Sequence, residues 1–258
     1  MLRGDDGSTP CPYHRPVPIA LHGGGEFLPG DEPFLDALLE TTRRTAAGRR
    51  GDISGLIRVA VVPTAAARGR PDLAGSNGVE AIRRRGQAAG LPVWAEAVPI
   101  IDEDSAADPA LAELVAAADL VYLPGGDPDI IPALLGNGSA VGRALHDAHE
   151  TGGVLAGASA GAMALAEWTW TTGGGVRGLG FVPGVAVFPH YEESRRKSWQ
   201  ENLERIAPAG LGYLGLDERT GVISNRDEWV VAGEGAAYWL APGMADPVVV
   251  DSGERLRL

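Results

Sequence analysis

Short apolar runs alternate with longer amphipathic segments over the first two thirds of the chain. The apolar runs, each ending at glycine or proline, are predicted as strands over residues 17–21, 56–63, 93–99, 119–126 and 152–157. The segments between them are predicted as helices over residues 31–48, 78–89, 108–118, 128–136 and 139–150. This rhythm requires parallel strands joined by crossover helices. The sequence therefore predicts a doubly wound α/β fold, with a mostly parallel sheet flanked by helices.

The pattern changes after about residue 198. One further helix is predicted to begin at Ser198, and short strands follow it: GYLGLD, GVIS, WVVAG, AAYWLA and PVVV. We expect these strands to form a β-rich C-terminal extension of the same sheet. Because no linker or repeat interrupts the pattern, residues 17–258 are predicted as a single α/β domain. Residues 1–16 are predicted as an irregular N-terminal segment.

Composition excludes several classes of protein. The net charge of −12 argues against non-specific binding to nucleic acid or anionic membranes, because both are polyanions. Cys11 is the single cysteine, which rules out an intramolecular disulfide and a cysteine-based zinc site. The start of the chain does not resemble a signal peptide, and the uncharged stretch 151–166 is shorter than the roughly 20 residues of a membrane span. We therefore expect a soluble, cytoplasmic protein without nucleic-acid or membrane partners. The oligomeric state stays open, a homodimer included.

Three glycine-rich loops fall at the ends of predicted strands. They span Gly23–Gly25, Gly125–Gly126 and Gly157–Gly161. In doubly wound folds, ligands bind at the carboxyl ends of the parallel strands. These three loops are therefore expected to meet at one site.

Ser159 lies in a G-x-S-x-G motif between a predicted strand and the residues MALAEW, which can start a helix. This is the context of a nucleophile elbow, in which a sharp turn exposes a reactive serine. Glycines at 157 and 161 remove side chains that would clash in the turn, and amides at the helix start are free to stabilise an oxyanion. An ordinary glycine-rich turn is the alternative interpretation.

A serine nucleophile needs a general base, usually a histidine. The chain has five histidines: His14, His22, His146, His149 and His190. His146 and His149 are spaced as two metal ligands on a helix would be, but we interpret them as a solvated helix face and predict no metal site. His190 ends the apolar run VAVFPH and precedes a polar segment. We favour His190 as the base, because a strand end that opens into a loop suits catalysis.

The order of the acidic residues discriminates between two kinds of hydrolase. The HGGG sequence at His22 invites an α/β-hydrolase esterase, in which HGGG forms the oxyanion hole and the triad order is serine, acid, histidine. Only Glu167 lies between Ser159 and His190, on a segment that we expect to be helical and to lead away from the site. The order serine, histidine, acid remains open. Asp217 and Glu218, at the end of a predicted strand, are the favoured acids.

The loop LPGGDP offers the second oxyanion donor. The amides of Gly125 and Gly126 can approach a substrate closely because no Cβ intervenes. Asp127 can bind substrate or cap the following helix. No glycine loop matches a nucleotide-binding loop or a complete dinucleotide fingerprint, so no cofactor is predicted.

The combination of HGGGEF, VVPTAAA, YLPGGDP, GASAGAMAL, GLGFVPGVAVFPHY and GLDERTGVI resembles the serine-peptidase family of aspartyl dipeptidase (dipeptidase E) and cyanophycinase. The resemblance runs from about residue 17 to 250. It implies a class I glutamine-amidotransferase-like fold in which a serine replaces the amidotransferase cysteine.

The resemblance also implies the roles of individual residues. Ser159 would be the nucleophile, His190 the base and Glu218 the acid, with the amides of Gly126 and Ala160 as the oxyanion hole. The implied reaction is hydrolysis of a small aspartyl or β-aspartyl peptide through an acyl-enzyme, without a metal. A non-catalytic binding protein on the same fold is a further alternative.

The segment HYEESRRKSW departs from the cyanophycinase pattern, in which a phenylalanine tends to follow the histidine. Substrate specificity is therefore the least determined property. Arg195 and Arg196 are candidate partners for an acidic substrate side chain, and a solvated basic start of a helix is the alternative interpretation.

Overall fold

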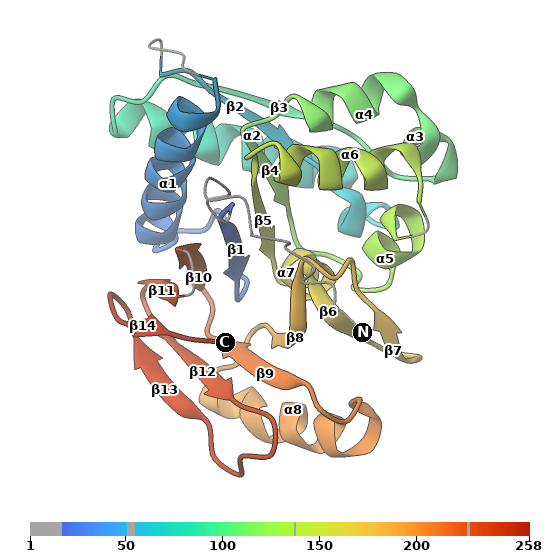
Figure 1. The fold of residues 1–258 in the computed structure, drawn as a ribbon, viewed down its shortest axis with the longest axis vertical. Coiled ribbons are helices and arrows are strands. Elements are labelled where there is room, and N and C mark those ends of the chain that lie inside the picture. Colours follow the sequence, from blue (N-terminus) through green and yellow to red (C-terminus); the bar gives the residue numbers. More distant parts are fainter. Residues whose placement is uncertain (1–16, 51–54, 137, 226–227) are drawn as a thin grey trace, which may run out of the picture.

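The computed structural model describes residues 17–50, 55–136, 138–225 and 228–258, and a large mixed sheet forms its centre (Figure 1). Five strands of this sheet are parallel: β1 (Ile19–His22), β2 (Ile57–Val61), β3 (Val93–Ala97), β4 (Leu120–Leu123) and β5 (Val154–Ala158). Three antiparallel strands continue it beyond β1: β10 (Thr220–Asn225), β11 (Glu228–Gly233) and β14 (Arg255–Leu256). The strand order is β14-β11-β10-β1-β5-β4-β2-β3. The predicted mostly parallel sheet is therefore confirmed.

Helices cover both faces of this sheet. One face packs against α1 (Glu32–Arg50) and α2 (Pro71–Ala88), whereas the other packs against α3 (Glu103–Ala107), α4 (Pro109–Ala116), α5 (Ile130–Leu135), α6 (Ala140–Glu150) and α7 (Ala160–Leu165). Alternation along β2 explains the two layers, because Val59 and Val61 join the α1–α2 core while Ala60 joins the opposite one. The doubly wound arrangement is confirmed.

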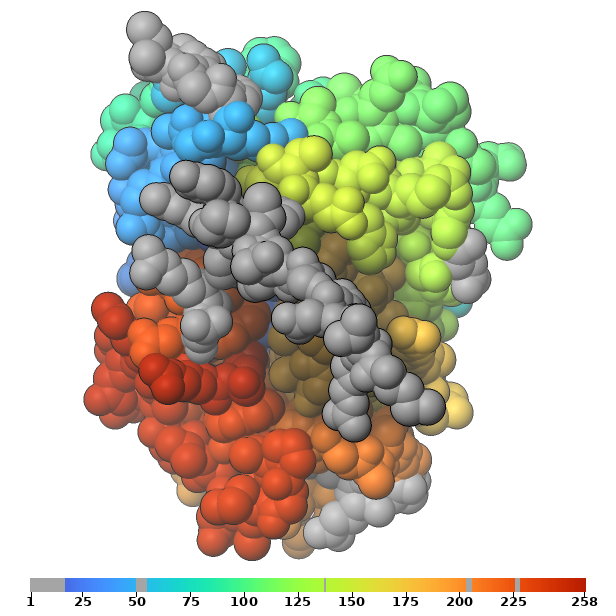
Figure 2. Space-filling model, viewed as in Figure 1, coloured from blue at the N-terminus to red at the C-terminus, as the bar shows by residue number. Residues whose placement is uncertain are grey.

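A second sheet adjoins the first. It contains β6 (Ala166–Thr171), β7 (Gly174–Arg177), β8 (Val182–Phe188), β9 (Gly212–Leu216), β12 (Ala236–Leu240) and β13 (Val248–Asp251), in the order β13-β12-β9-β8-β6-β7. The helix α8 (Glu193–Ile206) packs on it through Trp199, whose ring lies 4.7 Å from that of Phe188. The C-terminal residues, orange to red, form the lower part of the molecule, and the strands β8 and β9 run beneath the carboxyl ends of β1 and β5 (Figures 1 and 2).

The prediction that the C-terminal strands extend the same sheet is therefore wrong in part. β10, β11 and β14 join the main sheet, but β9, β12 and β13 belong to the second sheet. Because β10 occupies the place beside β1, the preceding strand β9 pairs instead with β8, in parallel. α8 also begins at Glu193, five residues before the predicted start at Ser198.

The residues after Ser159 also differ from expectation. The helix α7 ends at Leu165, and the sequence AEWTWT continues directly as β6, because alternating tryptophan and threonine favour a strand. Glu167, expected on a helix, lies on β6, and its carboxylate accepts a hydrogen bond from the Gly184 amide (2.6 Å).

The predicted irregular segment 1–16, which includes Cys11 and His14, lies outside the described residues. No helix in the described ranges combines the length and the apolar character needed to cross a bilayer.

Candidate active site

Ser159 sits on a sharp turn between β5 and α7. Its backbone has φ 49° and ψ −114°, a conformation that residues other than glycine rarely adopt. The flanking glycines permit the turn: a Cβ on Gly157 would lie 2.4 Å from the Gly161 carbonyl carbon, and a Cβ on Gly161 would lie 2.0 Å from the Leu123 oxygen. The strand, turn and helix expected of a nucleophile elbow are therefore present.

His190 reaches Ser159 from the second sheet. It follows β8 and also has a positive φ, of 52°. Its Nε2 lies 3.0 Å from the Ser159 Oγ, which is hydrogen-bond distance. The imidazole is 27% exposed, so that a substrate can reach the pair from solvent.

Glu218 completes the chain of contacts. Its Oε1 lies 2.7 Å from His190 Nδ1, and its own amide donates to the Glu192 carboxylate (2.9 Å). With the Nδ1 proton assigned to this contact, Nε2 is free to accept the serine proton. One hydrogen-bonded row thus joins Ser159, His190 and Glu218, although Ser159 and Glu218 lie 59 residues apart in sequence.

Asp217, the other candidate acid, faces away from His190. Its carboxylate accepts the Ala236 amide (3.1 Å) and lies 3.4 Å from the Tyr238 hydroxyl. The Arg196 guanidinium is 3.9 Å away. Asp217 therefore connects β9 to β12, whereas Glu218 faces the imidazole.

The buried position of Asp217 has a consequence for stability. Burial raises the pKa of Asp217 above its ordinary value of 3.8, because desolvation disfavours the carboxylate. The folded state then binds the proton more tightly than the unfolded state, so the contribution of Asp217 to stability is lost as pH rises above 3.8. Between pH 3.8 and the raised pKa of Asp217, we therefore expect the free energy of unfolding of the wild type to fall relative to that of Asp217→Asn. Urea titrations at successive pH values measure both free energies. A difference independent of pH would contradict this prediction.

The HGGG loop holds the three active-site segments together through its backbone. The carbonyl oxygens of His22, Gly23 and Gly24 accept hydrogen bonds in turn. Their donors are the amides of Ser159 (2.9 Å), His190 (2.7 Å) and Arg219 (2.7 Å). Three successive carbonyls thus fix the serine, the histidine and the residue after Glu218.

Two of the three glycine amides in the same loop already have acceptors. The Gly23 amide donates to the Thr220 carbonyl (2.8 Å), and the Gly24 amide lies 3.3 Å from His22 Nδ1. His22 itself is 0% exposed, and its Nε2 lies 2.9 Å from Asp31 Oδ1. The imidazole of His22 therefore has a structural position below the loop.

The amides of Gly126 and Ala160, the two predicted oxyanion donors, differ from the Gly23, Gly24 and Gly125 amides in having no acceptor within the described part of the chain. The neighbouring Gly125 amide is taken by the Glu26 carboxylate (2.7 Å). No acceptor is found for the Gly126 or Ala160 amide among the described residues. Gly126 has φ 154°, and a Cβ there would lie 2.2 Å from the Ala65 oxygen, so glycine is required at this position.

Replacing Gly24 would test how closely the HGGG loop constrains the His190 imidazole. It has φ 109°, and a Cβ would lie 2.3 Å from His190 Cε1. We expect Gly24→Ala to displace the ring and to lower kcat about 10- to 100-fold. Gly90→Ala is the matched control, because Gly90 also has a positive φ (66°) but no atom within 4 Å of the added Cβ. Equal kcat values for the two variants would show that the contact does not position His190.

The candidate substrate-binding residues lie in different surroundings. Asp127 is exposed, with its carboxylate 3.7 Å from Arg68. It is not the helix cap, since α5 has Asp129 in that position. Arg195 is exposed on α8. Arg196 lines the same cavity as Glu218, and it donates to the Tyr191 carbonyl (3.0 Å) and the Tyr238 hydroxyl.

His146 and His149 lie on α6, away from this site. Both rings contact Phe181, with centroid distances of 4.4 and 5.6 Å. His146 is exposed, but His149 is half-buried, so only the first lies on a solvated face. Within the described part of the chain, no three His, Cys, Asp or Glu side chains are grouped as a metal site would require.

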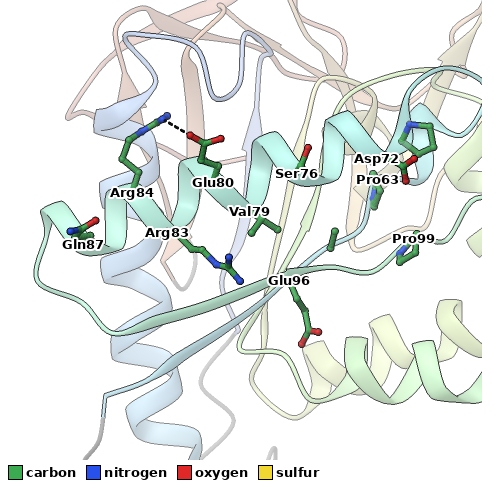
Figure 3. Close-up of a pocket in the computed structure, with 12 residues that line it drawn as sticks. Pro63, Asp72, Ser76, Val79, Glu80, Arg83, Arg84, Gln87, Glu96 and Pro99 are labelled. Carbon is green, nitrogen blue, oxygen red and sulfur yellow. Dashed lines mark ion pairs between the residues drawn. The ribbon is translucent and has the colours of Figure 1, made fainter.

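The cavities of the described surface include one beside Glu218 and one far from it. One, of about 350 Å³, borders Glu218 and is lined by Arg196, Asp217 and Arg219. The other, of about 760 Å³, lies between α2 and β3, with Val79, Arg83 and Glu96 on its wall (Figure 3). It contains none of the predicted site residues, whereas the smaller cavity is lined by Glu218.

Backbone strain is concentrated around the site. In the described ranges, positive φ outside glycine occurs only at Phe27, Ser159, His190 and Arg219. Each lies in a loop that contributes to or adjoins the row of catalytic candidates. Glu26 was not among the predicted site residues, although it directly follows the three glycines of the first loop.

Comparisons with known proteins identify one matching sequence family and similar solved structures. The sequence model of peptidase family S51 matches residues 55–231. The crystal structure of a peptidase from an acI-B1 actinobacterium has a TM-score of 0.77 and 25% identity, covering 95% of this chain and 98% of that one. A peptidase E-type protein from Listeria monocytogenes EGD-e has a TM-score of 0.54 and 13% identity, covering 85% and 99%, and supports the fold alone. No curated protein sequence matches the chain.

Proposed function

The chain belongs to peptidase family S51 and is a serine-type peptidase, and from this premise we propose that Ser159, His190 and Glu218 form its catalytic triad. The observation that carries the proposal is the continuous hydrogen-bonded row from Ser159 Oγ to His190 Nε2 (3.0 Å) and from His190 Nδ1 to Glu218 (2.7 Å). A nucleophile, a base and a group that orients the base are the parts that acyl transfer needs.

The proposed reaction proceeds in two halves. His190 Nε2 accepts the hydroxyl proton of Ser159 as Oγ attacks the peptide carbonyl, and Glu218 stabilises the imidazolium that forms. The Gly126 and Ala160 amides donate to the tetrahedral oxyanion. His190 then protonates the leaving amine, which departs and leaves an ester on Ser159. A water molecule, deprotonated by His190, hydrolyses that ester and regenerates the serine.

We propose small aspartyl or β-aspartyl peptides as the substrates. Arg196 supports this choice, since its guanidinium lines the cavity of about 350 Å³ that borders Glu218 and is fixed by Tyr191 and Tyr238. A fixed guanidinium is a suitable partner for a substrate carboxylate. Arg195, exposed on α8, and Asp127, exposed in the loop after β4, are secondary candidates.

No observation favours the esterase alternative, because the HGGG amides of Gly23 and Gly24 have acceptors within the protein. A panel of Asp-Leu, β-aspartyl-leucine, Ala-Leu and p-nitrophenyl acetate tests the proposal. We expect hydrolysis of one aspartyl peptide to exceed that of Ala-Leu and to be lost in Arg196→Ala. Hydrolysis of the ester alone would contradict the proposed substrate class.

A further inference from the structure

A carboxylate that the triad does not use lies beside the nucleophile. Glu26 follows the HGGG loop at the end of β1, and its side chain reaches the loop after β4, where Oε1 accepts the Gly125 amide (2.7 Å). β5, which carries Ser159, lies between these two strands in the sheet. A Cβ on Gly125 would lie 2.9 Å from Glu26 Oε1 and 3.1 Å from the Ser159 Cβ, so both side chains border the same point.

The charge of Glu26 has no counterpart in the surrounding protein. No ion pair joins Glu26 to a cation within the described residues, and Arg219, whose side chain borders the HGGG loop, pairs with Glu234 (3.5 Å). Below the loop, the pKa of the fully buried Tyr122 is raised by burial and further by the negative charges of Asp31 and Glu26. The Glu26 carboxylate therefore adds negative potential to the site.

Negative potential beside an oxyanion hole opposes the charge that develops in the transition state. Holding the Gly125 amide requires only an acceptor oxygen, which a neutral glutamine would also supply. A cationic group in the bound substrate would neutralise the Glu26 carboxylate, and Glu26 would then bind substrate without opposing the oxyanion.

We propose that Glu26 determines specificity by binding the α-ammonium of the substrate residue that becomes acylated to Ser159. In a peptide cleaved after its first residue, this nitrogen lies about 2.5 Å from the scissile carbonyl carbon. That carbon must itself approach the Ser159 Oγ to about 3 Å. The ammonium therefore reaches the region that Glu26 and Ser159 share. This inference rests on the proposed function and assigns the enzyme to peptides with a free amino terminus.

The test compares Asp-Leu and Ala-Leu with their N-acetyl derivatives at pH 7, where an α-amino group is mostly protonated. We expect the wild type to cleave free Asp-Leu with a kcat/KM about 10- to 100-fold above that for its acetylated form. Glu26→Gln, which keeps the acceptor for Gly125, should lose this preference, mainly because the KM for the free peptide rises. Its kcat/KM for the acetylated peptides should equal that of the wild type. Glu113→Gln removes the same charge from the exposed face of α4 and should keep the preference.

Labelling of Ser159 by a fluorophosphonate tests the nucleophile independently of the role proposed for Glu26. Labelled enzyme that cleaves free and acetylated peptides equally overturns the role of Glu26 alone, whereas labelled enzyme that cleaves neither overturns the proposed substrate class as well. A preference that persists in Glu26→Gln also overturns it. Absence of labelling in the wild type means that Ser159 is not nucleophilic, and the proposed function then fails first.

Discussion

Replacing Ser159 with alanine is expected to lower kcat for an aspartyl dipeptide by about 10⁴-fold or more, since the acyl-enzyme route is lost and only the oxyanion donors and binding remain. The fold should tolerate the change, because Oγ contacts only the His190 imidazole in the described structure. Steady-state hydrolysis, with thermal unfolding to verify the fold, measures both effects.

Ser76→Ala is the matched control for this prediction. Ser76 lies exposed on α2, where its hydroxyl donates to the Leu73 carbonyl (3.2 Å). Its kcat should equal that of the wild type. Activity of Ser159→Ala within tenfold of the wild type would place the nucleophile elsewhere.

The Glu218→Gln variant is expected to lose about 10³- to 10⁴-fold in kcat with a small change in KM. The amide keeps the size of the side chain, but it neither stabilises the imidazolium nor enforces the Nδ1 tautomer that leaves Nε2 free for Ser159. The measurement is kcat and KM for the same dipeptide.

Asp217→Asn is the neighbouring comparison. Asp217 contacts Ala236 and Tyr238 and not His190, so its replacement should change stability more than kcat. If Asp217→Asn proves the more damaging to kcat, the acid of the triad has been misassigned.

Much of the fold could be predicted because it is encoded locally. The five parallel strands were placed within a few residues, since each is a short buried run ended by glycine or proline. The helix α2 was predicted less well: it begins at Pro71 and not near Gly78, because glycines at 75 and 78 weakened its helical pattern.

The second sheet could not be predicted in the same way. β8 and β9 pair with each other across an intervening helix, and β6 follows α7 without a loop. Such pairings depend on long-range packing, for which a strand's own sequence gives little information. The position of His190 depends on this sheet, so its contact with Ser159 was inferred from its place at a strand end and from the family resemblance.

The order of the acidic residues in the sequence did not decide between Asp217 and Glu218 as the acid beside the histidine, whereas the family resemblance favoured Glu218. In the structure the two adjacent carboxylates have different partners, and only Glu218 lies within hydrogen-bond distance of His190. Glu26 could not be predicted as a site residue, because an acidic residue after a glycine loop has no spacing that distinguishes a functional residue. Its significance comes from the contact with Gly125, 99 residues away.

The nucleophilic character of Ser159 is tested most directly by mass spectrometry of the protein after reaction with a fluorophosphonate. We predict a single adduct on the peptide that contains Ser159, absent from Ser159→Ala and strongly reduced in His190→Ala. An adduct on another serine, or unchanged labelling in His190→Ala, would contradict the proposed triad.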